Sequence, residues 1–152
     1  MAGIDVADLG CGSGYALNVL GRAFPSSRFR GYDLSEEATA AARAHPADWG
    51  LDNVTFEVRD ITDLDLTDAF DLITTFDAIH DQADPARVLR AIVNALRPEG
   101  VHLCVDIAAS SHLEDNVEHP RPFSARPGVR SVTWRCRERR EDRGGRRPRG
   151  TR

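Results

Sequence analysis

A glycine-rich segment near the start of the chain is the first candidate for chemistry. Gly10, Gly12 and Gly14 alternate along it, and Asp8 precedes the first glycine by two positions. Glycine permits positive φ angles and lets a ligand approach the backbone closely. A carboxylate at Asp8 suits a ligand with a positive group better than it suits a pyrophosphate. A tight turn that serves only packing is the alternative interpretation of this segment.

The spacing of these glycines differs from that of dinucleotide-binding loops. Those loops carry Gly-x-Gly-x-x-Gly, and Tyr15 stands here where the third glycine is required. A nicotinamide-dependent oxidoreductase is therefore the less favoured alternative. Asp33 follows Gly14 by 19 residues, and an acid at such a place accepts hydrogen bonds from ribose hydroxyls in nucleotide-binding sheets. With Asp8 and the glycines it predicts a nucleoside site, whereas a helix cap or a solvated acid is the alternative for Asp33 alone.

Hydrophobic patterns predict the elements that hold these residues. Strands are expected at residues 4–9, 28–33, 54–59, 70–76 and 101–107. Helices are expected after the glycine segment, after Ser35 and after Asp84, and the second of them should break or kink at 45–46, where a proline follows His45. Strands that alternate with helices predict an α/β fold with a Rossmann-like, doubly wound parallel sheet. Ligands in such sheets bind at the carboxyl ends of the strands, where the strand order reverses.

Five motifs along the chain resemble, in their order and intervals, those of one known family. They occupy residues 8–14, 31–35, 59–61, 70–73 and 96–101, with the sequences DLGCGSG, GYDLS, RDI, FDLI and LRPEGV. Together they resemble the class I S-adenosylmethionine-dependent methyltransferases, over roughly residues 3–119. Residues 76–81 and 108–116 look closest to bacterial methyltransferases that carry an N-terminal winged-helix-like domain.

The resemblance implies S-adenosyl-L-methionine as the cofactor and methyl transfer to a small molecule as the reaction. The cofactor contacts that it implies are Asp8, Gly10, Cys11, Gly12, Gly14, Asp33, Leu34, Asp60, Ile61 and Phe76. Asp8 would lie near the ammonium group, Asp33 would hold the ribose diol, and Asp60 would accept a hydrogen bond from the adenine amino group. The reaction would be an in-line displacement from a sulfonium, in which the protein chiefly supplies orientation.

The methyl acceptor is expected after the strand at 70–76, where acceptor sites usually lie in this family. His80 is a candidate general base because the unperturbed pKa of histidine lies near neutrality, and Asp77 is a second candidate. A capping acid and a partly exposed histidine are the favoured interpretation, so the catalytic residues stay unassigned. The strand is not followed by the Asn/Asp-Pro-Pro-Tyr/Phe run of nucleic-acid amino methyltransferases, which disfavours nucleic acid as the acceptor.

Charge divides the 152-residue chain into two parts. Residues 1–120 hold 8 Arg and 21 Asp or Glu, a net charge of −13, whereas residues 121–152 hold 12 Arg and 3 acidic residues, a net charge of +9. We therefore expect a methyltransferase core at 1–119 and an Arg-rich, disordered tail at 120–152. The tail has three interpretations: an arm that binds nucleic acid, an appendage with no role, or the product of a reading frame that slipped. The third is favoured because the resemblance stops where the basic composition begins.

The sheet of the resembled family has seven strands, of which the last two form an antiparallel hairpin beside strand five. Only five strands are recognisable here, and the helical region that usually covers the cofactor is absent before the first strand. The chain is therefore expected to be truncated at both ends, and the strand at 101–107 to form an open edge of low stability. A non-catalytic protein that binds the cofactor or nucleic acid is a further alternative.

Cysteines and clustered acids add little further chemistry. The three Cys are too far apart for a metal cluster and too few for a paired framework, and a reducing cytoplasm is the simplest compartment. The acids at 63–71 lack the glycine and terminal Glu of a calcium loop, so no metal site is expected. Neither a signal peptide nor an apolar stretch of bilayer length is recognised, and we expect no membrane partner. The sequence does not specify an oligomeric state.

Overall fold

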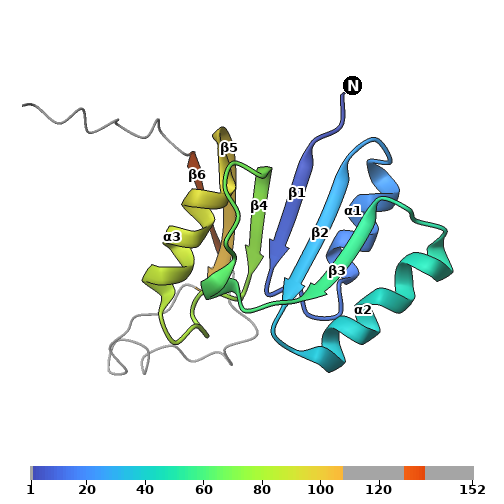
Figure 1. Cartoon of the computed structure of the whole chain (residues 1–152), viewed down its shortest axis with the longest axis horizontal. Helices are drawn as coiled ribbons and strands as arrows, with labels where there is room; N and C mark the ends of the chain where they lie inside the picture. Colours follow the sequence, from blue (N-terminus) through green and yellow to red (C-terminus); the bar gives the residue numbers. More distant parts are fainter. Residues whose placement is uncertain (1, 108–128, 136–152) are drawn as a thin grey trace, which may run out of the picture.

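The computed structural model describes residues 2–107 and 129–135, which form one six-stranded sheet with flanking helices (Figure 1). The strands are β1 (Asp5–Leu9), β2 (Arg28–Asp33), β3 (Val54–Val58), β4 (Phe70–Phe76), β5 (Leu96–Ile107) and β6 (Val129–Arg135). Their order is β3-β2-β1-β4-β5-β6, and β1 to β5 are parallel. The chain leaves β1 toward β2 and β3 and then crosses to β4 on the other side of β1, so the strand order reverses there. The predicted α/β, doubly wound parallel sheet is confirmed.

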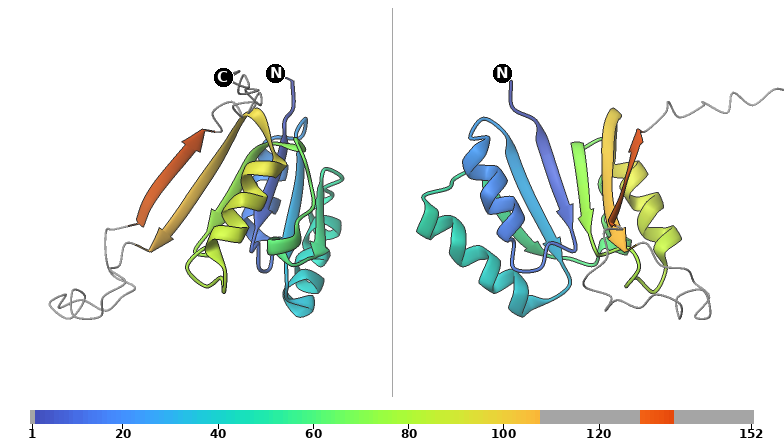
Figure 2. Two further views of the ribbon diagram at one scale, coloured as in Figure 1. Left: turned by 60° about the vertical axis from the view of Figure 1, so that its left-hand side comes forward. Right: turned by 180° about the vertical axis from the view of Figure 1, so that it is seen from behind.

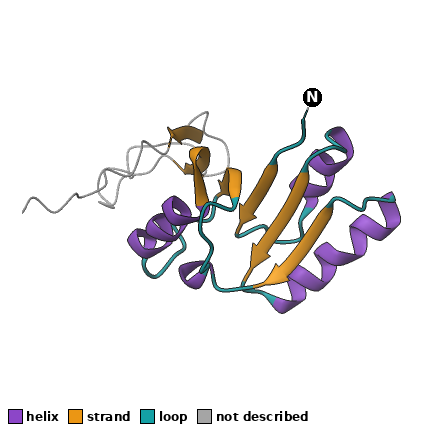
Figure 3. Cartoon of the chain, turned by 45° about the horizontal axis from the view of Figure 1, so that its top comes forward, coloured by secondary structure: helices purple, strands orange, loops and turns teal. Residues whose placement is uncertain are grey.

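Helices cover both faces of the sheet, as Figure 2 and Figure 3 show from two directions. They are α1 (Tyr15–Ala23), α2 (Glu36–Trp49), α3 (Pro85–Ala95) and the short 3-10 helix η1 (Ile61–Asp63). Successive side chains of a strand point to opposite faces, and β1 divides its apolar residues in this way. Val6 packs with Leu17 of α1 and Ala42 of α2, whereas Leu9 packs with Val88 of α3.

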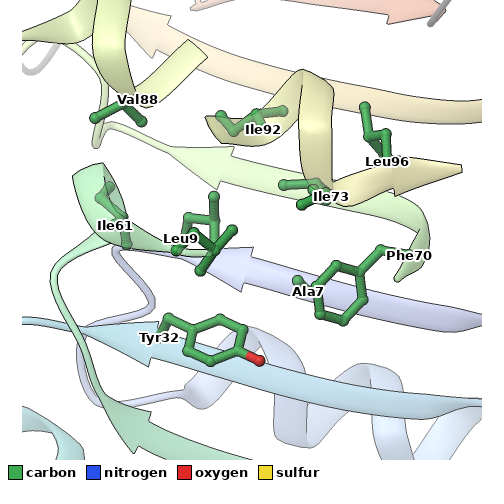
Figure 4. Packing of buried hydrophobic residues seen from close by; sticks show 11 residues of the cluster. Ala7, Leu9, Tyr32, Ile61, Phe70, Ile73, Val88, Ile92 and Leu96 are labelled. Atoms are coloured by element: carbon green, nitrogen blue, oxygen red, sulfur yellow. The ribbon is translucent and has the colours of Figure 1, made fainter. Parts of the chain in front are cut away.

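The cluster beneath α3 is the larger of the two apolar cores. Figure 4 shows Val88 and Ile92 of α3 pointing toward Leu9 of β1 and Ile73 of β4. Each of these four side chains is at most 1% exposed. Burial on this scale stabilises a fold by about 1.5–3 kcal/mol for each large aliphatic side chain. The cores on both faces fix the strand ends from which the candidate site residues project.

Of the break or kink predicted for the second helix at 45–46, the break does not occur. Helix α2 continues through Pro46 as far as Trp49, although an internal proline removes one hydrogen bond of the helix. The last turn is closed instead by Gly50, whose φ is 65°, and by a hydrogen bond of 2.8 Å from the Leu51 N–H to the Pro46 carbonyl. This Schellman-type ending satisfies carbonyls that the helix would otherwise leave unpaired, and Pro46 itself is buried.

Strand β5 begins five residues earlier than the sequence predicts. Leu96 pairs with Phe70, and the next paired residues are Val101 and Leu72, so β5 bulges out between the two pairs. The hydrophobic pattern alone identified only the regular part after this bulge. Extra residues in one strand leave a ladder continuous on either side, which sequence periodicity does not reveal.

A sixth strand lies where the sequence predicts only a disordered tail. Residues Val129–Arg135 pair antiparallel with β5, from Val101 with Arg135 to Ile107 with Val129, and Figure 2 shows the two arrows side by side in opposite directions. The expectation that β5 forms an open edge is therefore wrong. The segment VRSVTWR is rich in β-branched and aromatic residues, a strand preference that the arginine-rich composition obscured. The other residues of the tail lie outside the described part of the chain.

Candidate functional site

The glycines of the first motif form the loop between β1 and α1, at the carboxyl end of β1. The main-chain N–H groups of Gly10 and Cys11 donate to the carbonyl oxygen of Tyr32, over 2.8 and 3.2 Å. Gly10, Gly12 and Gly14 have φ angles of 73°, 53° and 71°. Because other residues adopt this left-handed conformation only at a cost, the backbone of the loop itself requires the three glycines.

The three glycines nevertheless have different surroundings. A Cβ atom at Gly10 would lie 2.7 Å from the Cβ of Ala78, and one at Gly14 would lie 2.4 Å from the ring of Phe56. A Cβ at Gly12 would meet nothing within 4 Å. The packing interpretation therefore holds for Gly10 and Gly14, whereas the surface above Gly12 has room for a ligand.

Asp33, at the end of β2, joins that strand to the glycine loop. Its Oδ2 accepts a hydrogen bond of 2.8 Å from the Gly12 N–H, and its Oδ1 accepts one of 2.9 Å from the Ser35 N–H. The cap of α2 is Ser35, whose Oγ accepts from the Ala38 N–H at 3.1 Å. Asp33 is thus not the helix cap, and its carboxylate is held in one orientation with acceptor capacity left over for a ligand. Beside it, the Leu34 side chain is 70% exposed.

Asp8 is a buried carboxylate at the same edge, only 3% exposed. Its Oδ1 accepts a hydrogen bond of 2.7 Å from the Thr74 hydroxyl of β4. Burial, with a smaller contribution from the negative charge of Asp33, raises the pKa of Asp8 to about 6, although the Thr74 bond acts in the opposite direction. A buried carboxylate with a raised pKa at the carboxyl edge of such a sheet is typical of a functional site. A cation bound beside it would stabilise its charged form.

Cys11 lies in the same loop but is not suited to nucleophilic chemistry. Burial, together with the negative charges of Asp8 and Asp33, raises the pKa of the Cys11 thiol to about 12. A thiol reacts as a nucleophile or metal ligand through its thiolate, which is therefore scarce here at neutral pH.

Asp60 and Ile61 follow β3, beside the end of β2. The Arg59 N–H donates to the Asp33 carbonyl over 2.9 Å, which brings the two strand ends together. Asp60 caps η1: its Oδ1 accepts from the N–H and the hydroxyl of Thr62, and these bonds hold its pKa below the usual value. The Ile61 side chain is only 5% exposed and belongs to the core, so its backbone alone is available to a ligand.

The two candidates for catalysis, Asp77 and His80, follow β4 on the other side of the glycine loop. Asp77 has a φ of 51°, and its N–H donates to the Val105 carbonyl of β5 over 2.8 Å. His80 Nδ1 lies 2.5 Å from Asp106 Oδ1, and His80 Nε2 lies 3.2 Å from Asp81 Oδ1. Phe76, the last residue of β4, is 39% exposed.

Sequence reasoning missed Asp106 as a partner of His80. The two residues are 26 positions apart, and no local motif joins them. The signal was available in the topology, because β4 and β5 are neighbouring parallel strands and their carboxyl ends meet at one edge. Polar residues at the ends of neighbouring parallel strands are therefore expected to come together at the edge where ligands bind.

Comparison with known proteins identifies the family. The profile of the family described as "Methyltransferase domain" matches residues 1–133 of this chain. The chain belongs to this methyltransferase family. The match runs beyond residue 119 and into β6, further than the motifs alone indicate.

Named relatives match the same part of this chain. A ubiquinone biosynthesis O-methyltransferase of Pseudomonas syringae is 32% identical over 104 residues, which are 66% of this chain and 43% of the relative. A malonyl-[acyl-carrier protein] O-methyltransferase of Bacillus cereus is 31% identical over 102 residues, 67% of this chain and 37% of the relative. The crystal structure of an S-adenosylmethionine-dependent methyltransferase from Mesorhizobium loti has a TM-score of 0.62 and 35% identity, and covers 70% of this chain and 48% of its own. The chain thus spans about two fifths of the length of these curated relatives.

The predicted cofactor residues of this chain all lie at the carboxyl edge of the sheet, the lower edge in Figure 1. Asp8, Gly12 and Asp33 form its centre, Asp60 lies on the β3 side, and Phe76 lies on the β4 side. Within the described residues, no three His, Cys, Asp or Glu side chains gather as metal ligands. No described helix is long and apolar enough to span a bilayer.

Proposed function

We propose that this chain binds S-adenosyl-L-methionine at the carboxyl edge of its sheet and transfers the methyl group to a small-molecule acceptor. The observation that carries the proposal is the grouping of Asp8, Gly12 and Asp33. Asp8 is a buried carboxylate that a cation would stabilise, Gly12 leaves open space, and Asp33 is a carboxylate fixed beside that space. Membership of the methyltransferase family supports it, and gives no support to the nicotinamide oxidoreductase.

Each residue of the edge has a role in this proposal. Asp8 pairs with the ammonium group of the cofactor, and Asp33 accepts from its ribose hydroxyls. The adenine ring packs on Leu34 and meets the Ile61 backbone, while Asp60 accepts from its amino group. When bound, S-adenosyl-L-methionine supplies a methyl group activated by its positive sulfur. The loop backbone at 10–14 and Phe76 line the methionine part.

The proposed acceptor is a small molecule rather than a nucleic acid. Support comes from the relatives, which are named O-methyltransferases that act in ubiquinone biosynthesis and on malonyl-[acyl-carrier protein]. We also propose a cytoplasmic location, in keeping with the free thiols of Cys11 and Cys104. We retain the proposed division into a core at 1–119 and a tail at 120–152 with one exception. Strand β6 lies within the tail by sequence but pairs with β5 of the core.

Calorimetric titration with S-adenosylhomocysteine tests the cofactor proposal. The unmodified chain should bind, and Asp33→Ala should lower the affinity about 10- to 100-fold, because it removes acceptors that are charged. Asp52→Ala is the matched control: Asp52 is exposed and lies before β3, at the opposite edge of the sheet. Thermal unfolding of all three proteins shows whether each is folded. A folded chain that does not bind, or equal affinity in Asp33→Ala, would contradict the proposal.

A further inference from the structure

The Asp106 carboxylate of strand β5 contacts both the ring and the backbone of His80. Asp106 Oδ1 lies 2.5 Å from the ring Nδ1, and Asp106 Oδ2 accepts from the backbone N–H of His80 at 3.2 Å. The two contacts fix both the position of the loop and the direction of the ring. The His80 side chain is 35% exposed and that of Asp106 is 19% exposed, so the pair is anchored below while the ring reaches the surface.

This pair lies beside the glycine loop, on the side away from the adenine residues. Ala78, two residues before His80, faces Gly10 so closely that a Cβ on the glycine would lie 2.7 Å from the Ala78 Cβ. The Asp77 N–H is bonded to the Val105 carbonyl, one residue before Asp106. The loop after β4 is thus fixed between the glycine loop and β5, where an acceptor would approach a bound methyl donor.

We propose that Asp106 is a positioning residue that holds His80 as the general base for a hydroxyl acceptor, an inference that rests on the proposed function. A carboxylate at Nδ1 accepts the ring N–H, so the lone pair of the neutral ring is on Nε2. When Nε2 takes up a proton, the same carboxylate stabilises the imidazolium, as in the Ser-His-Asp arrangement. The Asp81 carboxylate lies 3.2 Å from Nε2 on a side chain that is 76% exposed, so the acceptor hydroxyl would take its place beside the neutral ring.

The chemistry favours a neutral hydroxyl group, of the phenol or enol type, over an amine or a carboxylate. A carboxylate carries no proton at neutral pH, and a neutral amine attacks through its nitrogen lone pair before it loses a proton, so neither needs a base fixed in this way. The acceptor oxygen transfers its proton to His80 Nε2 and forms the new bond to the methyl carbon. The electron pair of the broken carbon–sulfur bond stays on sulfur, which becomes a neutral thioether.

The first test is the tautomer of His80, measured by nitrogen NMR on the full chain labelled at its five histidines. His80→Gln identifies the signal. In the parent chain the neutral ring should carry its proton on Nδ1, whereas Asp106→Asn should shift the population toward Nε2–H. Asp106→Glu, which keeps the carboxylate, should retain the parent tautomer, and Asp52→Asn makes the same chemical change at the opposite edge. A neutral ring with its proton on Nε2 in the parent, or no change in Asp106→Asn, would overturn the proposal.

The second test separates this inference from the cofactor proposal. S-adenosylhomocysteine should bind Asp106→Asn and the parent chain alike, so a failure of all binding would count against the proposed function, not against the pair. With labelled S-adenosylmethionine, catechol serves as the hydroxyl probe and aniline as the amine probe. Methylation of catechol that falls about 100-fold or more in His80→Gln supports the base. Methylation of aniline, which needs no fixed base, should not depend on His80, whereas catechol methylation that is undiminished in His80→Gln would overturn the proposal.

Discussion

Each end of strand β1 carries a buried carboxylate, and the two have pKa values shifted in opposite directions. At the amino end, Asp5 accepts two hydrogen bonds from Arg28, of 2.7 and 2.9 Å, and one of 2.9 Å from Arg97. These partners, Arg28 first, lower the pKa of Asp5 to about 2 despite its burial. Three residues on, burial raises the pKa of Asp8 to about 6.

This difference in pKa separates a carboxylate that stabilises the fold, Asp5, from one that is suited to bind a ligand, Asp8. Asp5 is stabilised as an anion, so its ion pairs contribute to folding at neutral pH. Asp8 is disfavoured as an anion, so above its pKa it lowers the stability of the ligand-free chain. A positive group bound beside Asp8 would stabilise its carboxylate as an anion, so the site is suited to bind such a group. Active sites commonly lower the stability of a fold in this way.

The largest effect on stability is expected at the carboxyl edge, where two glycines of the same loop should respond differently to replacement by alanine. Gly14→Ala forces a side chain into a positive φ and places its Cβ 2.4 Å from the Phe56 ring, so it should destabilise the fold by about 3 kcal/mol. Gly12→Ala meets open space and should cost only about 1 kcal/mol. Denaturant unfolding measures both values.

Gly12 should matter more for ligand binding than it does for the stability of the fold. Gly12→Ala should remain folded and lose affinity for S-adenosylhomocysteine, because its methyl group occupies the space proposed for the ligand. Equal stability of the two variants would show that the surroundings described for Gly14 do not constrain it. Undiminished binding by Gly12→Ala would remove Gly12 from the site.

A smaller effect is expected at the amino end. Asp5→Asn should lower the free energy of unfolding at pH 7 by about 1–2 kcal/mol, a value reduced because the Arg28 side chain is 72% exposed. The folded pKa of Asp5 lies below its unfolded value, so its contribution is present above about pH 4 and is lost as the pH falls toward about 2. The difference between parent and variant should disappear over that range. Loss of S-adenosylhomocysteine binding by a folded Asp5→Asn would break the division of roles between the two ends.

Much of this fold is predictable because its signals are local. The bounds of β2 and β4 follow from the sequence, and Ser35 and Asp84 begin helices as their cap preferences indicate. The failures concern interactions that a single segment does not contain. Pro46 is tolerated because of the closing turn at Gly50, and β6 is a strand because β5 offers it a partner.

The candidate site divides in the same way. The glycine spacing and Asp33 are visible in the sequence, since each belongs to a motif on one βα unit. The different surroundings of Gly12 and Gly14, the arginine partners of Asp5 and the pairing of His80 with Asp106 depend on segments that are distant in sequence. Only the assembled sheet brings such segments together, so no pattern along the chain specifies these contacts.

The central claim is that Asp8 lowers stability in order to bind a positive group, and Asp8→Asn tests it most directly. At pH 7 this variant should be more stable than the parent by about 2–3 kcal/mol. The folded pKa of Asp8 lies above its unfolded value, so this advantage should shrink as the pH falls from about 6 to about 4. Its affinity for S-adenosylhomocysteine should fall about tenfold or more.

Unfolding and calorimetry on the same two proteins, parent and Asp8→Asn, give the decisive measurement. A variant that is more stable and binds more weakly is the expected result. A variant that is less stable than the parent at pH 7, or that binds S-adenosylhomocysteine equally well, would contradict the account.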